Sequence, residues 1–94
     1  MNRQQLVAAA ARRSSLTQRQ VRRALQAIVE TVAEALADGQ PVVLPNFGRF
    51  DLQRYSGRTV PRFGEEGAYT VRERWVPIFR SAPALRRKVR EKRS

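Results

Sequence analysis

Pro45-Asn46-Phe47-Gly48-Arg49-Phe50 is the stretch that decides the fold of this chain. It follows the apolar run Val42-Val43-Leu44, and asparagine and glycine are the residue types that tolerate positive φ. We therefore predict a tight turn over residues 46–48, between a short strand over 42–44 and a second strand over 48–55. In that second strand Phe50 and Leu52 should face one way, and Arg49, Asp51 and Gln53 the other.

Two amphipathic helices are predicted before the turn, over residues 3–13 and from Thr17 to about Asp38. Thr17 and Gln20 form a T-x-x-Q capping box at the start of the second helix, and Gly39 is its expected C′ residue. Apolar residues recur every three or four positions along this helix, and the chain has too little other apolar surface to cover the face that they form. A helix-turn-helix DNA reader is disfavoured, because the second helix is long and its reading end is apolar.

A β-ribbon arm is predicted after the second strand. Residues 54–64 offer little to a core, residues 65–67 form a turn, and residues 68–74 return as a strand. Two-stranded ribbons are marginal alone in water, so an arm of this kind orders on a partner. Residues 75–79 return the chain to the body, and Ser81-Ala82-Pro83 then predicts a cap and a first-turn proline ahead of a short basic helix.

Composition points to a polyanionic partner. The 94 residues suit one domain, and 19 Lys and Arg against 8 Asp and Glu give a net charge of +11. Nucleic acid is the usual partner of so basic a domain, and an anionic membrane surface is the other polyanion to consider. The chain has no cysteine or histidine, which excludes disulfides, a Cys/His zinc site and catalysis by a histidine base. Without a membrane-length apolar run or a secretory signal, we expect an intracellular protein.

The whole chain resembles the HU / integration host factor family of bacterial histone-like, architectural DNA-binding proteins. Residues 46–50 read N-F-G-R-F where the family has G-F-G-x-F, and Asn46 suits a positive-φ turn in place of glycine. Val76-Pro77-Ile78-Phe79 matches the family's closing x-P-x-F. The spacing from Phe50 to Pro77 matches a full-length family arm without a gap.

The resemblance implies an α+β fold that forms an intertwined homodimer. A two-helix V base is followed by a three-stranded antiparallel sheet with a protruding β-ribbon arm and a short C-terminal helix. The single domain, 1–94, would comprise a helical dimerisation base (1–40), a sheet and arm (41–80, the arm at about 53–75) and a C-terminal helix (81–94). Its expected dimer core is Val29, Val32, Leu36, Leu44, Phe47, Phe50 and Phe79.

The resemblance also implies the function. We expect the protein to bind double-stranded DNA through the minor groove with little sequence specificity, and to bend or compact it. It would be cytoplasmic and nucleoid-associated, with no catalytic residue, metal, cofactor, small-molecule substrate or membrane partner. The expected DNA-binding residues are Arg3, Arg54, Arg58, Pro61, Arg62, Phe63, Arg72, Arg74, Arg80, Arg86 and Lys88.

The arm tip differs from the family pattern. Pro61-Arg62-Phe63 stands where the family has Arg-Asn-Pro, whose proline wedges between base pairs. Phe63 occupies the wedge position, and phenylalanine is a known wedge type. Pro61 in a shifted turn is a second candidate, and a tip that touches only phosphates is the third. Ala82-Pro83 also replaces a Gly-Lys pair, which leaves Arg80 and Arg86 to supply the missing phosphate contact.

Four alternatives stay open at this stage. One is site-specific DNA bending of the integration-host-factor type, and a second is RNA binding, although nothing in the chain resembles an RNA-recognition motif. A third is a heterodimer with a paralogue. An enzyme is the weakest, because the acids of the β half form no metal or acid–base cluster: Asp51, Glu65, Glu66 and Glu73.

Overall fold

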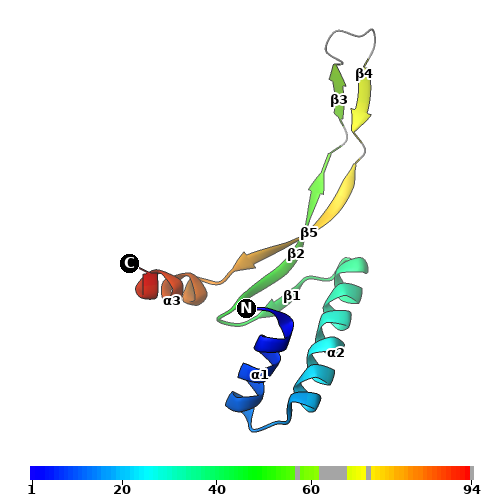
Figure 1. The fold of residues 1–94 in the computed structure, drawn as a ribbon. Coiled ribbons are helices and arrows are strands. Elements are labelled where there is room, and N and C mark those ends of the chain that lie inside the picture. Colours follow the sequence, from blue (N-terminus) through cyan, green and yellow to red (C-terminus); the bar gives the residue numbers. More distant parts are fainter. Residues whose placement is uncertain (57, 62–67, 72, 94) are drawn as a thin grey trace. The chain divides into compact units, whose positions relative to one another are not determined.

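The computed structural model describes residues 1–56, 58–61, 68–71 and 73–93, and the side chains of 1–56 and 73–93. Figure 1 shows the elements in chain order: α1 (Arg3–Ser14), α2 (Gln18–Ala37), β1 (Val42–Leu44), β2 (Gly48–Tyr55), β3 (Arg58–Pro61), β4 (Ala68–Val71), β5 (Arg74–Ser81) and α3 (Pro83–Arg93). Contacts divide the chain into two compact units, Met1–Ala35 and Leu36–Ser94.

The first unit is a helical hairpin with capped ends. Thr17 Oγ1 accepts from the Gln20 N–H at 3.1 Å, and Gln20 Oε1 accepts from the Thr17 N–H at 3.0 Å, which confirms the predicted capping box. Asn2 and Gln5 form a second box at the start of α1 that the sequence analysis missed. Ser15, at φ 63°, ends α1 in the left-handed conformation.

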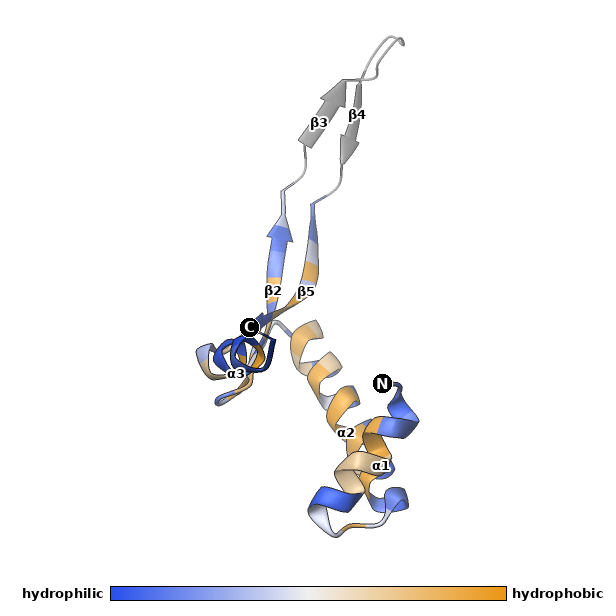
Figure 2. Ribbon diagram, turned by 60° about the vertical axis from the view of Figure 1, so that its left-hand side comes forward, coloured by the Kyte–Doolittle hydropathy of each residue, from blue (hydrophilic) through white to orange (hydrophobic). Residues whose placement is uncertain are grey.

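The core of the helical unit is thin. Among the described side chains, only Val7, 2% exposed, and Ala11 are apolar and buried. Both belong to α1, one of the two helices predicted to be amphipathic, while Val21 and Leu25 of α2 are half-buried. Much of the length of α2 is apolar (Figure 2), yet no residue of this helix is buried. Helix α2 therefore presents an uncovered apolar face, as its periodicity predicted.

The second unit is built on an antiparallel sheet of strand order β1-β2-β5. The register pairs Val42 with Phe50 and Phe50 with Phe79, and the β2–β5 ladder runs without a break to Tyr55↔Arg74. Strands β3 and β4 pair separately, from Arg58↔Val71 to Pro61↔Ala68. The predicted α+β fold, with its three-stranded sheet and two-stranded ribbon, is confirmed.

The turn between β1 and β2 depends on two residues in different ways. Asn46 has φ 68°, as predicted, and the Phe47 N–H closes the turn on the Leu44 carbonyl at 3.0 Å. Gly48 opens β2, as predicted, and a Cβ there would lie 2.4 Å from Cζ of Phe79. Glycine is thus needed at 48 because an aromatic ring crosses its backbone.

Helix α3 begins at Pro83, which confirms the predicted first-turn proline. The Arg86 N–H bonds to the Ala82 carbonyl at 3.1 Å, and the Ala82 N–H bonds to the Phe47 carbonyl at 2.9 Å. This second bond ties the start of α3 to the β1–β2 turn. The basic C-terminal segment therefore emerges from the same end of the sheet as the turn.

Candidate nucleic-acid interface

The sheet has one apolar and one polar face, because side chains alternate along each strand and cross-strand partners share a side. The register sets Phe50 and Phe79 on the apolar face, where their ring centroids lie 5.1 Å apart. The polar face consists of the following residues of β2 and β5: Arg49, Asp51, Gln53, Tyr55, Arg74, Val76, Ile78 and Arg80.

Two arginines lie directly opposite each other on the polar face. Arg49 of β2 pairs with Arg80 of β5 in the register. Nε of Arg49 lies 2.9 Å from Oδ2 of Asp51, and Oδ1 of Asp51 accepts from the Leu52 N–H at 2.8 Å. This hydrogen bond, together with the positive charges of Arg49 and Arg80, lowers the pKa of the Asp51 carboxyl below its ordinary value of 3.8, against a smaller opposing effect of burial.

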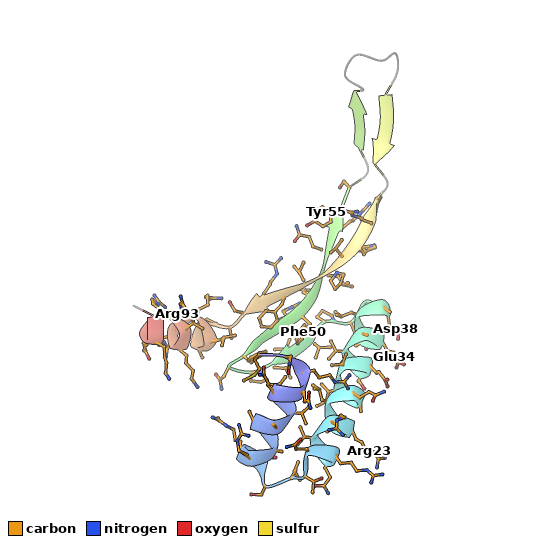
Figure 3. The ribbon with its side chains drawn as sticks, in the orientation of Figure 1. Arg23, Glu34, Asp38, Phe50, Tyr55 and Arg93 are labelled. Atoms are coloured by element: carbon orange, nitrogen blue, oxygen red, sulfur yellow. The ribbon has the colours of Figure 1, made fainter. Side chains whose placement is uncertain are left out.

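A third arginine lies at the outer end of the same face. Arg74 is the register partner of Tyr55, and its guanidinium carbon lies 5.5 Å from the centre of the Tyr55 ring. Figure 3 labels Tyr55 at the far end of β2 from Phe50. Arg49, Arg80 and Arg74 thus mark a basic face along the length of the β2–β5 ladder.

Arg54 does not join this face. Its register partner is Trp75, so both lie on the side of Phe50 and Phe79. The Arg54 guanidinium is paired with the carboxylate of Glu73. The structure therefore separates Arg54 from Arg74, although the sequence analysis placed both in one set of arm contacts.

Three further predicted DNA-binding residues lie on helices. Arg86 of α3 donates from one guanidinium nitrogen to the Ser81 carbonyl and to the Ser81 hydroxyl, which holds its side chain at the end of β5. Lys88 lies exposed on the same helix. Arg3 belongs to the helical unit, where it lines an open hollow with Gln4, Val7 and Arg22.

The remaining predictions concern the arm. Arg58 and Pro61 lie in β3, but their side chains are outside the described part of the structure. Arg62, Phe63 and Arg72 are outside the described residues altogether. Their predicted contacts, including the choice of wedge, stay predictions.

The seven predicted dimer-core residues are all incompletely covered. In the helical unit Val29 is 58% exposed and Val32 is half-buried. In the second unit Phe47 is 47% exposed, and its ring centroid lies 5.5 Å from that of Phe79. The other members are half-buried or exposed to a similar extent: Leu36, Leu44, Phe50 and Phe79.

Arg49 is the residue of the polar face that the sequence analysis left out of its site. The alternation of side chains along β2 had already placed Arg49 on the side of the strand away from Phe50, together with Asp51 and Gln53. What was missing was the register, which sets Arg49 against Arg80. A search of β2 for basic residues facing away from Phe50 and Leu52 would have found it.

The described residues contain no group of three or more Asp or Glu side chains that could hold a metal ion. No helix in the described part of the chain is long and apolar enough to cross a membrane. What the described residues do offer is a basic sheet face made of guanidinium groups. Such groups suit phosphate, which they bind through two parallel hydrogen bonds.

Comparisons with known proteins agree with this chemistry. A profile of the family described as bacterial DNA-binding protein matches residues 1–90. DNA-binding protein HU from Thermotoga maritima is 31% identical over 90 residues, covering 96% of this chain and 100% of that protein. DNA-binding protein HU from Clostridium pasteurianum is 30% identical over 89 residues, covering 95% and 98%.

Solved structures give the same result. The Anabaena HU–DNA cocrystal structure has a TM-score of 0.83 at 31% identity and covers 95% of this chain and 97% of its own. HU from Thermotoga maritima has a TM-score of 0.69 at 28% identity and covers 95% and 98%. From its motifs, its sheet and these matches over nearly its whole length, this chain belongs to the HU-type family of bacterial DNA-binding proteins.

Proposed function

We propose that two copies of this chain form an intertwined homodimer that binds duplex DNA through the minor groove and bends it, with little preference for sequence. The observation that carries the proposal is the two-faced sheet: three arginines mark one face, and the other is apolar and poorly covered. One face suits phosphate and the other suits a second protein surface. The protein would act in the bacterial nucleoid as an architectural component, without making or breaking bonds.

The apolar surface supports the dimer. In the second unit Phe47, Phe50 and Phe79 form a chain of ring contacts, yet none of the three is buried. In the helical unit, Ile28 and Val29 are both more than half exposed. Burial of apolar surface contributes about 25 cal/mol per Å², and a chain of this size needs more than it covers alone. A second copy supplies the missing cover for both units.

The arginines support phosphate binding. Each cation that meets a phosphate releases condensed counterions, so the affinity falls with salt at a log–log slope of about −0.9 per contact. We propose that Arg74, Arg80, Arg86, Lys88 and Arg3 make such contacts from the described part of the chain. Arg58, Arg62 and Arg72 would extend them along the arm. Arg54 would join only after leaving Glu73, because the two are paired in the free protein.

The minor groove presents mainly an A·T-versus-G·C pattern, so contacts there carry little sequence information. Preference would come from how easily a sequence bends. The alternative to this proposal is site-specific bending, in which one DNA sequence is bound far more tightly than others. One duplex bound far above its shuffled counterparts would replace the non-specific proposal, and a preference for structured RNA over duplex DNA would overturn it.

The test combines dimerisation, binding and bending. Sedimentation gives the mass in solution, and Trp75, the single tryptophan of the chain, provides a binding signal from the base of the arm. Energy transfer between dyes on the two DNA ends gives the bend. We expect a dimer whose affinity for DNA falls steeply as the salt concentration rises. On binding, the two labelled DNA ends should move closer to each other. A monomer, or a wild type that does not bind duplex DNA at low salt, overturns the proposal.

The wedge is tested in the same assay. We expect Phe63→Ala to bind duplex DNA and to bend it less, because a side chain that unstacks a base step is lost. Pro61→Ala is the matched variant at the tip. If Phe63→Ala bends as well as wild type, Phe63 is not the wedge. A loss in Pro61→Ala alone then assigns the role to Pro61.

A further inference from the structure

We infer that Arg49 and Arg80 form one phosphate-binding site on the polar face, and that the carboxylate of Asp51 holds this site in the free protein until a DNA phosphate displaces it. The inference rests on the proposed DNA binding and adds to it a site and a residue that limits affinity. Arg80 is already among the predicted contacts, whereas Arg49 and Asp51 are new.

Arg49 and Arg80 lie side by side on the polar face. As direct cross-strand partners they bring two positive charges to the same place on one side of the ladder. Like charges placed opposite each other destabilise a strand pair unless an anion lies between or beside them. The site is therefore built for a negative group.

A carboxylate already lies at this site, paired with Arg49. Asp51 lies two residues from Arg49 on the same strand and side, and its Oδ2 lies 2.9 Å from Arg49 Nε. Its register partner is the neutral Ile78, so Arg49 and Arg80 are the charged residues that face it from β2 and β5. The hydrogen bond from the Leu52 N–H is the largest cause of its lowered pKa, and the charges of Arg49 and Arg80 lower it further, in keeping with a carboxylate that lies in their combined field.

A phosphate can displace the Asp51 carboxylate from Arg49. The Arg49 side chain is 48% exposed and that of Asp51 is 23% exposed, so an outside anion reaches the arginine. Guanidinium has five donors, more than one carboxylate engages. Asp51 also keeps a partner when it loses Arg49, because its other oxygen accepts the Leu52 N–H at 2.8 Å.

The Asp51 carboxylate competes with DNA phosphate for Arg49. A phosphodiester takes up the fork of an arginine through two parallel bonds. The displaced carboxylate stays on the polar face and repels the incoming phosphate. Asp51 therefore weakens DNA binding, and its removal should strengthen it.

The test uses Asp51→Asn in the full chain, which keeps an oxygen for Leu52 and removes the charge. Binding to a short duplex is measured over a salt series. We expect a gain of about two- to five-fold per copy of the chain, the range of an exposed ion pair. We also expect the salt slope to steepen by up to about one. Glu34→Gln on α2 is the matched control, because it removes the same charge from an exposed helical residue (Figure 3) and should change binding little.

The double variant Arg49→Gln/Asp51→Asn decides whether the gain passes through Arg49. We expect it to bind no better than Arg49→Gln alone. A gain that persists without Arg49, or that Glu34→Gln matches, overturns the inference while duplex binding by wild type still stands. If circular dichroism shows that Asp51→Asn does not fold, Arg49→Gln alone decides: few-fold weaker binding and a shallower slope support the site, and unchanged binding overturns it.

Discussion

Gly48→Ala should destabilise the protein through a steric clash between β2 and β5. The added Cβ would lie 2.4 Å and 2.5 Å from two ring atoms of Phe79, and 2.8 Å from the Arg80 carbonyl oxygen. Phe79 is 43% exposed in the single chain, but in the proposed dimer a second copy covers its ring and limits any outward movement. Movement would give up its contacts with Phe47 and Phe50, at 5.5 Å and 5.1 Å between centroids. The Arg80 carbonyl belongs to the backbone of β5, so it can move away from the added Cβ only if β2 and β5 separate.

The magnitude follows from these contacts. Overpacking of a fitted site costs about 1–3 kcal/mol, and each aromatic pair contributes about 0.5–1.5 kcal/mol beyond its area. We therefore expect Gly48→Ala to lower the free energy of unfolding by about 2–4 kcal/mol. For a domain of this size, that corresponds to a fall in Tm of roughly 10 °C or more.

The assay is thermal unfolding followed by circular dichroism at matched protein concentration, because association changes the apparent stability. Gly39→Asn is the control. Gly39 has φ 81° with nothing within 4 Å of a built Cβ, and asparagine tolerates that conformation. We expect its Tm to fall by only a few degrees. A Gly48→Ala protein that melts no lower than Gly39→Asn would refute the steric argument.

Two further predictions concern the cap of α2 and the titration of Asp51. Thr17→Ala should lower the free energy of unfolding by about 1 kcal/mol, because it removes the acceptor of the Gln20 N–H. Thr31→Ala is the control: it removes only a hydroxyl bond to the Ala27 carbonyl within the helix and should leave the Tm nearly unchanged. Equal falls in Tm for the two variants would contradict this prediction. The pKa of Asp51 is lowered in the folded protein, so its contribution to stability is present above its ordinary value of 3.8 and is lost as the pH falls through the lower folded value. Between pH 5 and about pH 2.5 the Tm of wild type should therefore fall further than that of Asp51→Asn, and parallel curves would show that Asp51 makes no such contribution.

Local signals in the sequence were enough for the helices and the turn. The capping box at Thr17, the positive φ of Asn46 and the first-turn Pro83 each depend on residues that are near neighbours in the chain. The second capping box, at Asn2, had the same kind of signal and was overlooked. This capping box could have been predicted from the sequence alone, because Asn2 and Gln5 lie three residues apart.

The contacts between strands β2 and β5 could not be predicted from the sequence. The need for glycine at 48 comes from the Phe79 ring, and the site at Arg49 comes from its pairing with Arg80. Both depend on the register of two strands that lie far apart in the chain. Alternation predicts which side of β2 a residue occupies, but it does not predict which residue of β5 it meets.

That register joins the two functions of the sheet. A slip of one residue would move the aromatic residues of one strand to the polar face and its arginines to the apolar face. The turn at Asn46 and the close approach at Gly48 disfavour such a slip, because one fixes the hairpin β1–β2 and the other fits β2 against Phe79. The residues that set the turn and the strand packing thus also align Arg49 with Arg80. A substitution at Gly48 should therefore weaken DNA binding as well as folding, although Gly48 has no side chain to contact DNA.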